Sequence, residues 1–127
     1  MFEIKNDGWD SILVCYQGAE EAVTIPDHVT IIGKDAFKKC KITRIVIPKS
    51  VRRIEDGAFF GCRDLTQLVF SDPHCSVSIG HKSFYGCHSL TELTLPYGVV
   101  YCDNSFAHCK RLTCIHQSPP PVRSWNF

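Results

Sequence analysis

The amino-acid sequence predicts a short right-handed solenoid, α/β in class and predominantly β, with one parallel sheet of about five strands on its concave face. Phe followed three residues later by Cys recurs four times, starting at Phe37, Phe59, Phe84 and Phe106. The Phe-to-Phe spacings are 22, 25 and 22 residues. After each Cys, an aliphatic residue precedes Thr, and a second aliphatic residue follows two positions later. This alternation suits a strand, and units with a single apolar edge bury it by stacking.

Each unit is built in the same order. A period of about 20–29 residues with regular aliphatic positions is typical of leucine-rich repeats. Pro follows the last apolar residue of a strand at Ile25, Ile47 and Leu95, where the missing amide ends the ladder. The Phe-x-x-Cys spacing places both side chains on one side of a helical or 3₁₀ turn. Turns, short strands or short helical pieces are therefore expected on the convex side.

These repeats resemble the BspA-like class of leucine-rich repeat proteins. The segments that carry the resemblance are IPDHVTIIGKDAFKKCKITRI (25–45) and IPKSVRRIEDGAFFGCRDLTQL (47–68), with weaker copies at 70–93 and 95–115. With its flanking segments the resemblance covers about residues 11–122. It implies a non-catalytic module that binds proteins, often in adhesion, and a bacterial or protist family whose members are often secreted or on the cell surface.

A chain of 127 residues is expected to form one leucine-rich-repeat domain, residues 1–127. Residues 1–19 are expected to form an N-terminal cap in which Phe2-Glu3-Ile4 pairs with Ile12-Leu13-Val14 across a turn, with Trp9 as cover. A frayed arm is the alternative. The repeats occupy 20–117.

Residues 118–127 are expected to form a C-terminal cap or tail. Because it contains Trp125 and Phe127, we expect this end to be docked or continued by further sequence. The third repeat has two extra residues and a turn-prone segment, SDPHCS, and the fourth has Tyr101–Asn104 in place of Ile54–Gly57. The coil is expected to be irregular at both places.

The eight cysteines divide into two groups. Four occupy the core position of the repeat, where a reduced thiol packs as a small apolar group. The other four are Cys15, Cys75, Cys102 and Cys114. A disulfide among these four stays open.

The sequence contains no apolar run long enough for a membrane helix and no visible secretory signal. The default expectation is therefore a cytoplasmic location, although members of the family are often exported.

Charge is concentrated near the start of the repeats. Residues 1–27 carry a net charge of −5, and residues 34–53 carry +7. The expected basic patch comprises Lys34, Lys38, Lys39, Lys41, Lys49, Arg52 and Arg53. A solvated surface is the plain interpretation, and binding to a carbohydrate or another anionic surface is the alternative. Nucleic acid is not expected, because one aromatic residue alone, Phe37, falls in the run and no reader motif is present.

The outward positions of the concave strands are the expected binding surface for another protein. The predicted contact residues are Arg44, Val46, Gln67, Val69, Glu92, Thr94, Cys114 and His116. Self-association of copies through this face or through the solenoid's edges stays open. A third column of Thr residues at the strand entries is explained by structure, since stacked hydroxyls can bond across coils.

No catalytic residues, metal ligands or cofactors are assigned. Cys114 and His116 are the candidate ligand pair, and a Cys/His metal or redox module is a further alternative function. The same pair could act as nucleophile and base, but the sequence suggests no acid to orient the His and no cleft to hold a substrate. The protein is therefore expected not to be an enzyme.

Overall fold

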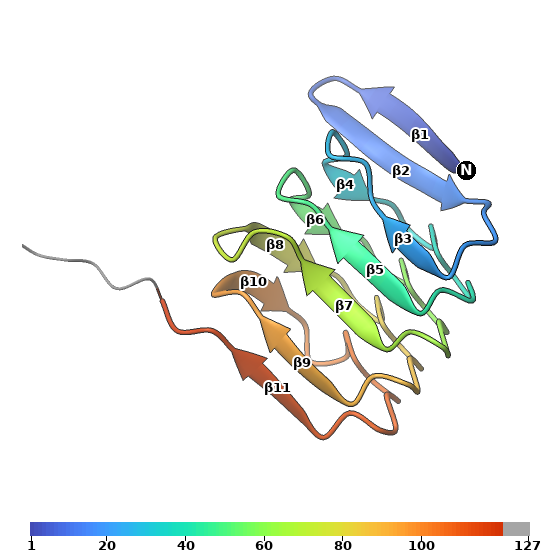
Figure 1. The fold of residues 1–127 in the computed structure, drawn as a ribbon. Helices are drawn as coiled ribbons and strands as arrows, with labels where there is room; N and C mark the ends of the chain where they lie inside the picture. Colours follow the sequence, from blue (N-terminus) through green and yellow to red (C-terminus); the bar gives the residue numbers. More distant parts are fainter. Residues whose placement is uncertain (121–127) are drawn as a thin grey trace, which may run out of the picture.

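The computed structural model describes residues 1–120, and they wind into stacked coils made of strands and turns (Figure 1). Strands of the first row are β3 (Ala22–Thr24), β5 (Arg44–Ile47), β7 (Gln67–Phe70), β9 (Glu92–Leu95) and β11 (Cys114–Gln117). Strands of the second row are β2 (Asp10–Tyr16), β4 (Ile31–Ile32), β6 (Arg53–Ile54), β8 (Ser76–Ile79) and β10 (Gly98–Tyr101). No helix, and so none that could span a membrane, occurs in residues 1–120.

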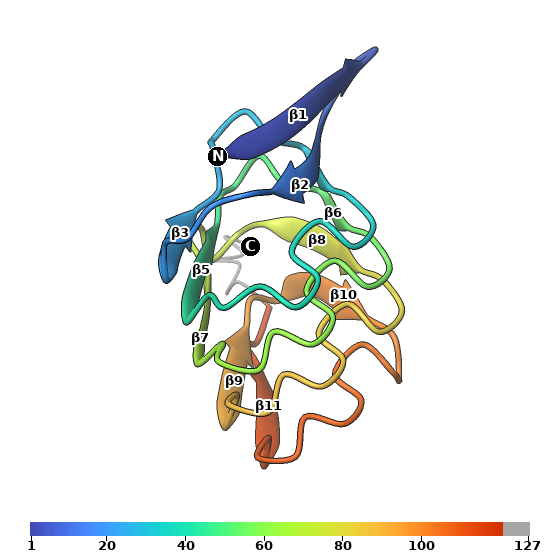
Figure 2. The same cartoon turned by 90° about the vertical axis from the view of Figure 1, so that its right-hand side faces the viewer.

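The strands within each row are parallel. The second row is a continuous sheet in the order β2-β4-β6-β8-β10, and β1 (Phe2–Asp7) pairs antiparallel with β2 at its end. In the view turned by 90°, the coils stack from β2 at the top to β11 at the bottom, and turns join the strands of the two rows (Figure 2). The stacked parallel strands confirm the solenoid that the repeat period predicts.

The core contains a stack of aromatic rings, one from each coil. The rings of Phe37, Phe59, Phe84 and Phe106 follow one another at centroid distances of 4.8–5.2 Å, and the first three side chains are fully buried. Offset stacking of buried rings adds to the free energy gained by removing their area from water. This is why the Phe spacing sets the length of each coil.

The segment from Phe to Cys is a run of turns rather than the helical or 3₁₀ turn that the spacing favours. Amides of Phe60 and Cys62 donate to the carbonyls three residues earlier. The residue between them, Gly61, has a φ of +70°, and Lys39, Gly86 and His108 have the same left-handed conformation in the other coils. A residue with positive φ interrupts a right-handed helix, so each coil turns here instead of continuing.

The first row is interrupted in the middle. Strands β3, β5 and β7 form one sheet, while β9 and β11 form another, so the expected sheet of five strands is divided in two. The interruption lies beside the loop that contains the two extra residues of the third repeat, residues 71–75. Residues Leu68 and Phe70 of β7 are only partly buried, unlike Ile45 and Ile47 of β5. The irregularity predicted for this repeat thus opens the first row of strands.

The second expected irregularity, in the fourth repeat, is milder. Tyr101 takes the register position of Ile79 and is 41% exposed, whereas Ile79 is buried. Its ring meets Phe106 edge-on at 5.6 Å. The second row therefore keeps its pairing through β10 while its last side chain leaves the core.

The N-terminal strands form the hairpin that the Asn-Asp-Gly sequence predicts, with Ile4 opposite Leu13. Tyr16 at the end of β2 stacks on Phe37 at 5.2 Å, and Phe2 packs on Tyr16 at the same distance. The prediction that Trp9 covers the first coil is wrong, because Trp9 is at the hairpin tip and is 99% exposed. The expectation for Trp125 and Phe127 lies outside the described residues.

Candidate functional site

The outward side chains of the first row form the surface that we call the front face. Register pairing places Ala22 beside Arg44 and Arg44 beside Gln67, and then Glu92 beside Cys114 across the second sheet. The neighbouring column contains Thr24, Val46, Val69, Thr94 and His116. These are the columns that strand alternation predicts.

Inward and outward residues of these strands differ in burial as the pattern requires. Val23, Ile45 and Leu93 point into the core and are at most 4% exposed. Arg44 and Gln67 lie on the opposite side of the sheet and are exposed. The front face therefore combines charged, amide, hydroxyl and aliphatic groups on a backbone that the core holds in place. A role in binding stays a prediction for these residues.

The Thr column at the strand entries stabilises the coils. Thr66 Oγ1 donates to the Thr43 carbonyl at 3.0 Å, and Thr113 Oγ1 donates to the Thr91 carbonyl at 3.1 Å. The acceptors are main-chain carbonyls of the preceding coil rather than neighbouring hydroxyls. These contacts agree with the structural explanation of the Thr residues.

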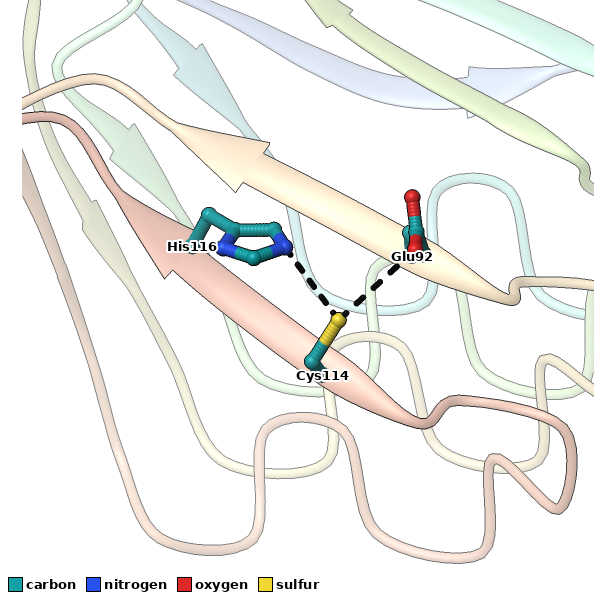
Figure 3. A group of neighbouring side chains, drawn as sticks. All are labelled: Glu92, Cys114 and His116. Carbon is teal, nitrogen blue, oxygen red and sulfur yellow. Dashed lines mark hydrogen bonds between the residues drawn. The ribbon is translucent and has the colours of Figure 1, made fainter.

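Three potential metal-binding side chains meet on the lower part of the front face (Figure 3). Cys114 Sγ is 3.3 Å from His116 Nε2 and 3.9 Å from Glu92 Oε1. The sequence pairs Cys114 with His116 but suggests no acid beside them, and the structure corrects that view by adding Glu92. The sequence pattern could have indicated Glu92, because it occupies the same outward column as Cys114 on the preceding strand.

The cysteines of the repeat carry out a second task besides filling space. The thiols of Cys62, Cys87 and Cys109 each donate to the carbonyl of the ladder Phe in the preceding coil, at 3.0, 3.4 and 3.1 Å. Burial, followed by the neighbouring Cys40, raises the pKa of Cys62 to about 12. A hydrogen bond with Cys109 and burial also raise the pKa of Cys87. The thiols of Cys62 and Cys87 are therefore protonated donors at neutral pH.

All eight cysteines are free, including the four for which a disulfide stayed open. Cys75 is buried, and burial raises its pKa. Cys15, Cys102 and Cys114 are partly exposed. No pair in the structure is cross-linked.

The seven residues of the expected basic patch have different neighbours. Arg52 pairs with Asp10, Lys49 lies 3.9 Å from Asp72, and Arg53 lies 3.8 Å from Glu55. Lys34 lines a shallow depression next to Arg53. The remaining three, Lys38, Lys39 and Lys41, lie together on the turn side of the coils. Acidic neighbours thus partly neutralise three of the seven basic residues.

A groove of about 460 Å³ is lined by two of those lysines, Lys39 and Lys41. The partly buried rings of Phe60 and Tyr85 stack along its wall at 4.7 Å, and the ammonium group of Lys38 lies 5.6 Å from the Phe60 centroid. Other residues around the groove are Arg63, Asp64 and His88. Partial desolvation, followed by the positive charges of Lys110 and Arg63, lowers the pKa of His88.

Sequence reasoning missed this groove as a unit. The available signal was the aromatic residue that directly follows the ladder Phe in the second and third repeats, Phe60 and Tyr85. The side chain that follows an inward Phe points outward. The repeat that stacks the core rings therefore also stacks the rings of Phe60 and Tyr85 outside the core. The groove is therefore a product of the repeat.

The comparisons with known proteins agree with the fold. A family model described as BspA type leucine-rich repeat region, in six copies, matches residues 14–121. A leucine-rich repeat protein from Bacteroides capillosus is 29% identical, with a TM-score of 0.80 over 93% of each chain.

Two further crystal structures share the fold at lower identity. A leucine-rich repeat protein from T. pallidum is 23% identical, with a TM-score of 0.68 over 90% of this chain and 67% of its own. A leucine-rich cell surface protein from Faecalibacterium prausnitzii is 24% identical, with a TM-score of 0.68 over 91% of this chain and 43% of its own. The search of curated proteins finds no match. Because the family model spans most of the chain, this protein belongs to the BspA-type leucine-rich repeat family.

Proposed function

We propose that the protein is a non-catalytic protein-binding module whose front face contacts another protein. The observation that carries the proposal is the aligned pair of outward columns, in which Arg44, Val46, Gln67 and Val69 lie side by side in register. Leucine-rich repeat domains typically bind proteins, and membership of the family supports this role. Adhesion is the finer form of the proposal and follows from the family resemblance alone.

The chemistry of the front face favours a protein as the partner. Arg44 and Glu92 are charges of opposite sign on different strands, and Gln67 and Val69 between them are neutral. Such a mixed surface offers a few hydrogen bonds around apolar contacts, as protein interfaces do. Because little charge of one sign is concentrated there, binding is expected to depend weakly on ionic strength.

The test is affinity capture from the source organism with the wild-type chain and two matched double variants. Arg44→Glu with Gln67→Lys changes a register pair of the first row, and Arg53→Glu with Ser78→Lys changes a register pair of the second row. The first variant is expected to lose the captured protein and the second to retain it. Retention by both variants would contradict the proposal, while capture of a second copy of this chain would identify the interaction as self-association.

A second candidate function rests on the groove beside Lys39 and Lys41. We infer that a sulfated or otherwise anionic carbohydrate binds there, because sugars pack on aromatic rings such as Phe60 and Tyr85 and the surrounding bases attract anions. Binding of a sulfated oligosaccharide should weaken steeply with salt and fall in Phe60→Ala. Binding that is independent of salt or insensitive to Phe60→Ala would dismiss this candidate.

A further inference from the structure

The front face contains a cluster of three potential metal ligands among its predicted contact residues. Glu92 on β9 and Cys114 and His116 on β11 each offer one ligand atom, and the three atoms lie within 4.8 Å of one another. Cys114 and His116 are two residues apart on the same side of one strand, and Glu92 is opposite Cys114 on the paired strand. Figure 3 shows the three side chains converging on one point above the sheet.

We propose that Glu92, Cys114 and His116 bind a zinc ion. A thiolate, an imidazole and a carboxylate are the three ligand types that zinc accepts in proteins. Zinc–sulfur bonds of about 2.3 Å and zinc–nitrogen bonds of about 2.1 Å at tetrahedral angles place two ligand atoms about 3.6 Å apart. The separations of 3.3 Å from Cys114 Sγ to His116 Nε2 and 3.9 Å to Glu92 Oε1 lie on either side of that value.

The position of the cluster suits a metal that enters from solution. Glu92 and His116 are exposed and Cys114 is partly exposed, so an ion reaches all three without a change in the core. Three protein ligands would leave the fourth position of a tetrahedral zinc ion for water or another ligand.

The strands limit how much the ligands need to move. Residue pairs Glu92–Cys114 and Thr94–His116 are fixed by the parallel ladder between β9 and β11. Only side-chain rotations are then required, which keeps the entropic cost of binding small. Cys114 binds a metal as the thiolate, so its proton is released to solvent on binding.

A second Cys–His pair in the same protein provides a matched control. Cys102 Sγ is 3.9 Å from His81 Nε2, and the other ring nitrogen of His81 is 3.0 Å from the Asn104 amide oxygen. Within residues 1–120, no carboxylate lies close enough to this pair to complete a group of three metal ligands. It should therefore bind zinc weakly or not at all.

The experiment is titration of the reduced full chain with Zn²⁺ against a chromophoric chelator, and with Co²⁺ to record the thiolate-to-metal charge-transfer band. One ion per chain and a cobalt–thiolate band are expected. Cys114→Ser should abolish the band and Cys102→Ser should leave it unchanged. Removing a residue that only orients a metal ligand typically lowers metal affinity roughly 10–100-fold. His116→Ala removes a ligand itself, so zinc affinity should fall by at least that factor.

Glu92→Gln separates a three-residue site from a Cys–His pair. The amide keeps the size of the side chain and removes its charge, so the band should persist while zinc affinity falls about tenfold or more. Equal affinity in Glu92→Gln and wild type would remove Glu92 from the site. Absence of a thiolate band, or its loss in Cys102→Ser instead of Cys114→Ser, would overturn the proposal.

Discussion

At the residue scale, the Phe and Cys of the second, third and fourth repeats each contact the ladder Phe of the preceding coil. Phe59 stacks between Phe37 and Phe84, and Cys62 donates its thiol proton to the Phe37 carbonyl. The same carbonyl accepts the amide of Cys40 in its own coil. A buried carbonyl has two lone pairs to satisfy, and a thiol is small enough to reach one without enlarging the core. This explains why the repeat uses Cys at a position where other apolar residues would also fit.

Replacing Phe59 with Ala should reduce the free energy of unfolding by about 3–5 kcal/mol, the usual cost of truncating a fully buried Phe. The neighbouring ring of Phe60 is only partly buried and stacks on Tyr85 outside the core. Phe60→Ala should therefore cost less than about 1.5 kcal/mol. Urea unfolding of both variants measures the difference, and equal losses would show that the ladder Phe is not the main core contact.

The raised pKa of Cys62 predicts a loss of stability at alkaline pH. Its pKa rises from 9.0 in the unfolded chain to about 12 in the folded protein. Between these values the folded state binds more protons, so the free energy of unfolding falls as pH rises, by up to about 1.4 kcal/mol per pH unit. Below the unfolded pKa the thiol is protonated in both states and adds no slope.

Urea unfolding at a series of pH values from neutral to alkaline measures that slope. Cys62→Ser retains a donor to the Phe37 carbonyl but does not titrate in this range. The variant should therefore lose stability more gradually than wild type. If the two proteins show the same slope, the Cys62 thiol is not the group that links folding to alkaline pH.

At the element scale, the N-terminal hairpin contacts the first coil through Tyr16 rather than Trp9. Tyr16 is 7% exposed and stacks on Phe37. Tyr16→Ala should cost about 2–4 kcal/mol because it opens the end of the aromatic stack. Trp9→Ala should change stability by less than about 0.5 kcal/mol, since the ring is almost fully solvated. Thermal or urea unfolding compares the two, and a larger effect of Trp9→Ala would contradict this packing.

The interruption of the first row should be visible in hydrogen exchange. The amides of Thr66 and Thr113 donate to Thr43 and Thr91 of the preceding coils at 2.8 and 2.9 Å. Between these two pairs, the amide of Thr91 makes no corresponding bond to Thr66 in the described residues. Because exchange requires an amide free of its hydrogen bond, Thr91 should exchange faster than the other two. Similar protection of all three would show that the first row is continuous.

At the scale of the whole molecule, the repeat period made most of the fold predictable. Strand alternation assigned Ile45 to the core and Arg44 to the surface, because side chains in a strand alternate strictly between faces. The Asn-Asp-Gly turn indicated the hairpin through local backbone preference. These features depend on neighbours that are close in sequence or one repeat away.

Features that depend on a particular departure from the repeat were harder to predict. The extra residues near Asp72 indicated an irregular loop, but they did not reveal that β7 and β9 separate. Composition could not show that Trp9 points away from the coil, because both orientations suit a hairpin turn. Lys39 and Lys41 are grouped with Phe60 through the left-handed turns. Composition does not predict the positive φ of Lys39 in such a turn.

The most direct test of the proposed interaction is site-specific photo-crosslinking. A photoreactive residue is placed at Gln67 on the front face, at Arg63 beside the groove or at Trp9 on the hairpin tip, and each protein is irradiated with the captured partner. The account predicts a cross-link from Gln67 that excess unlabelled wild-type chain suppresses, and none from Trp9. Cross-links from Arg63 without any from Gln67 would place the partner on the groove side and contradict binding through the front face.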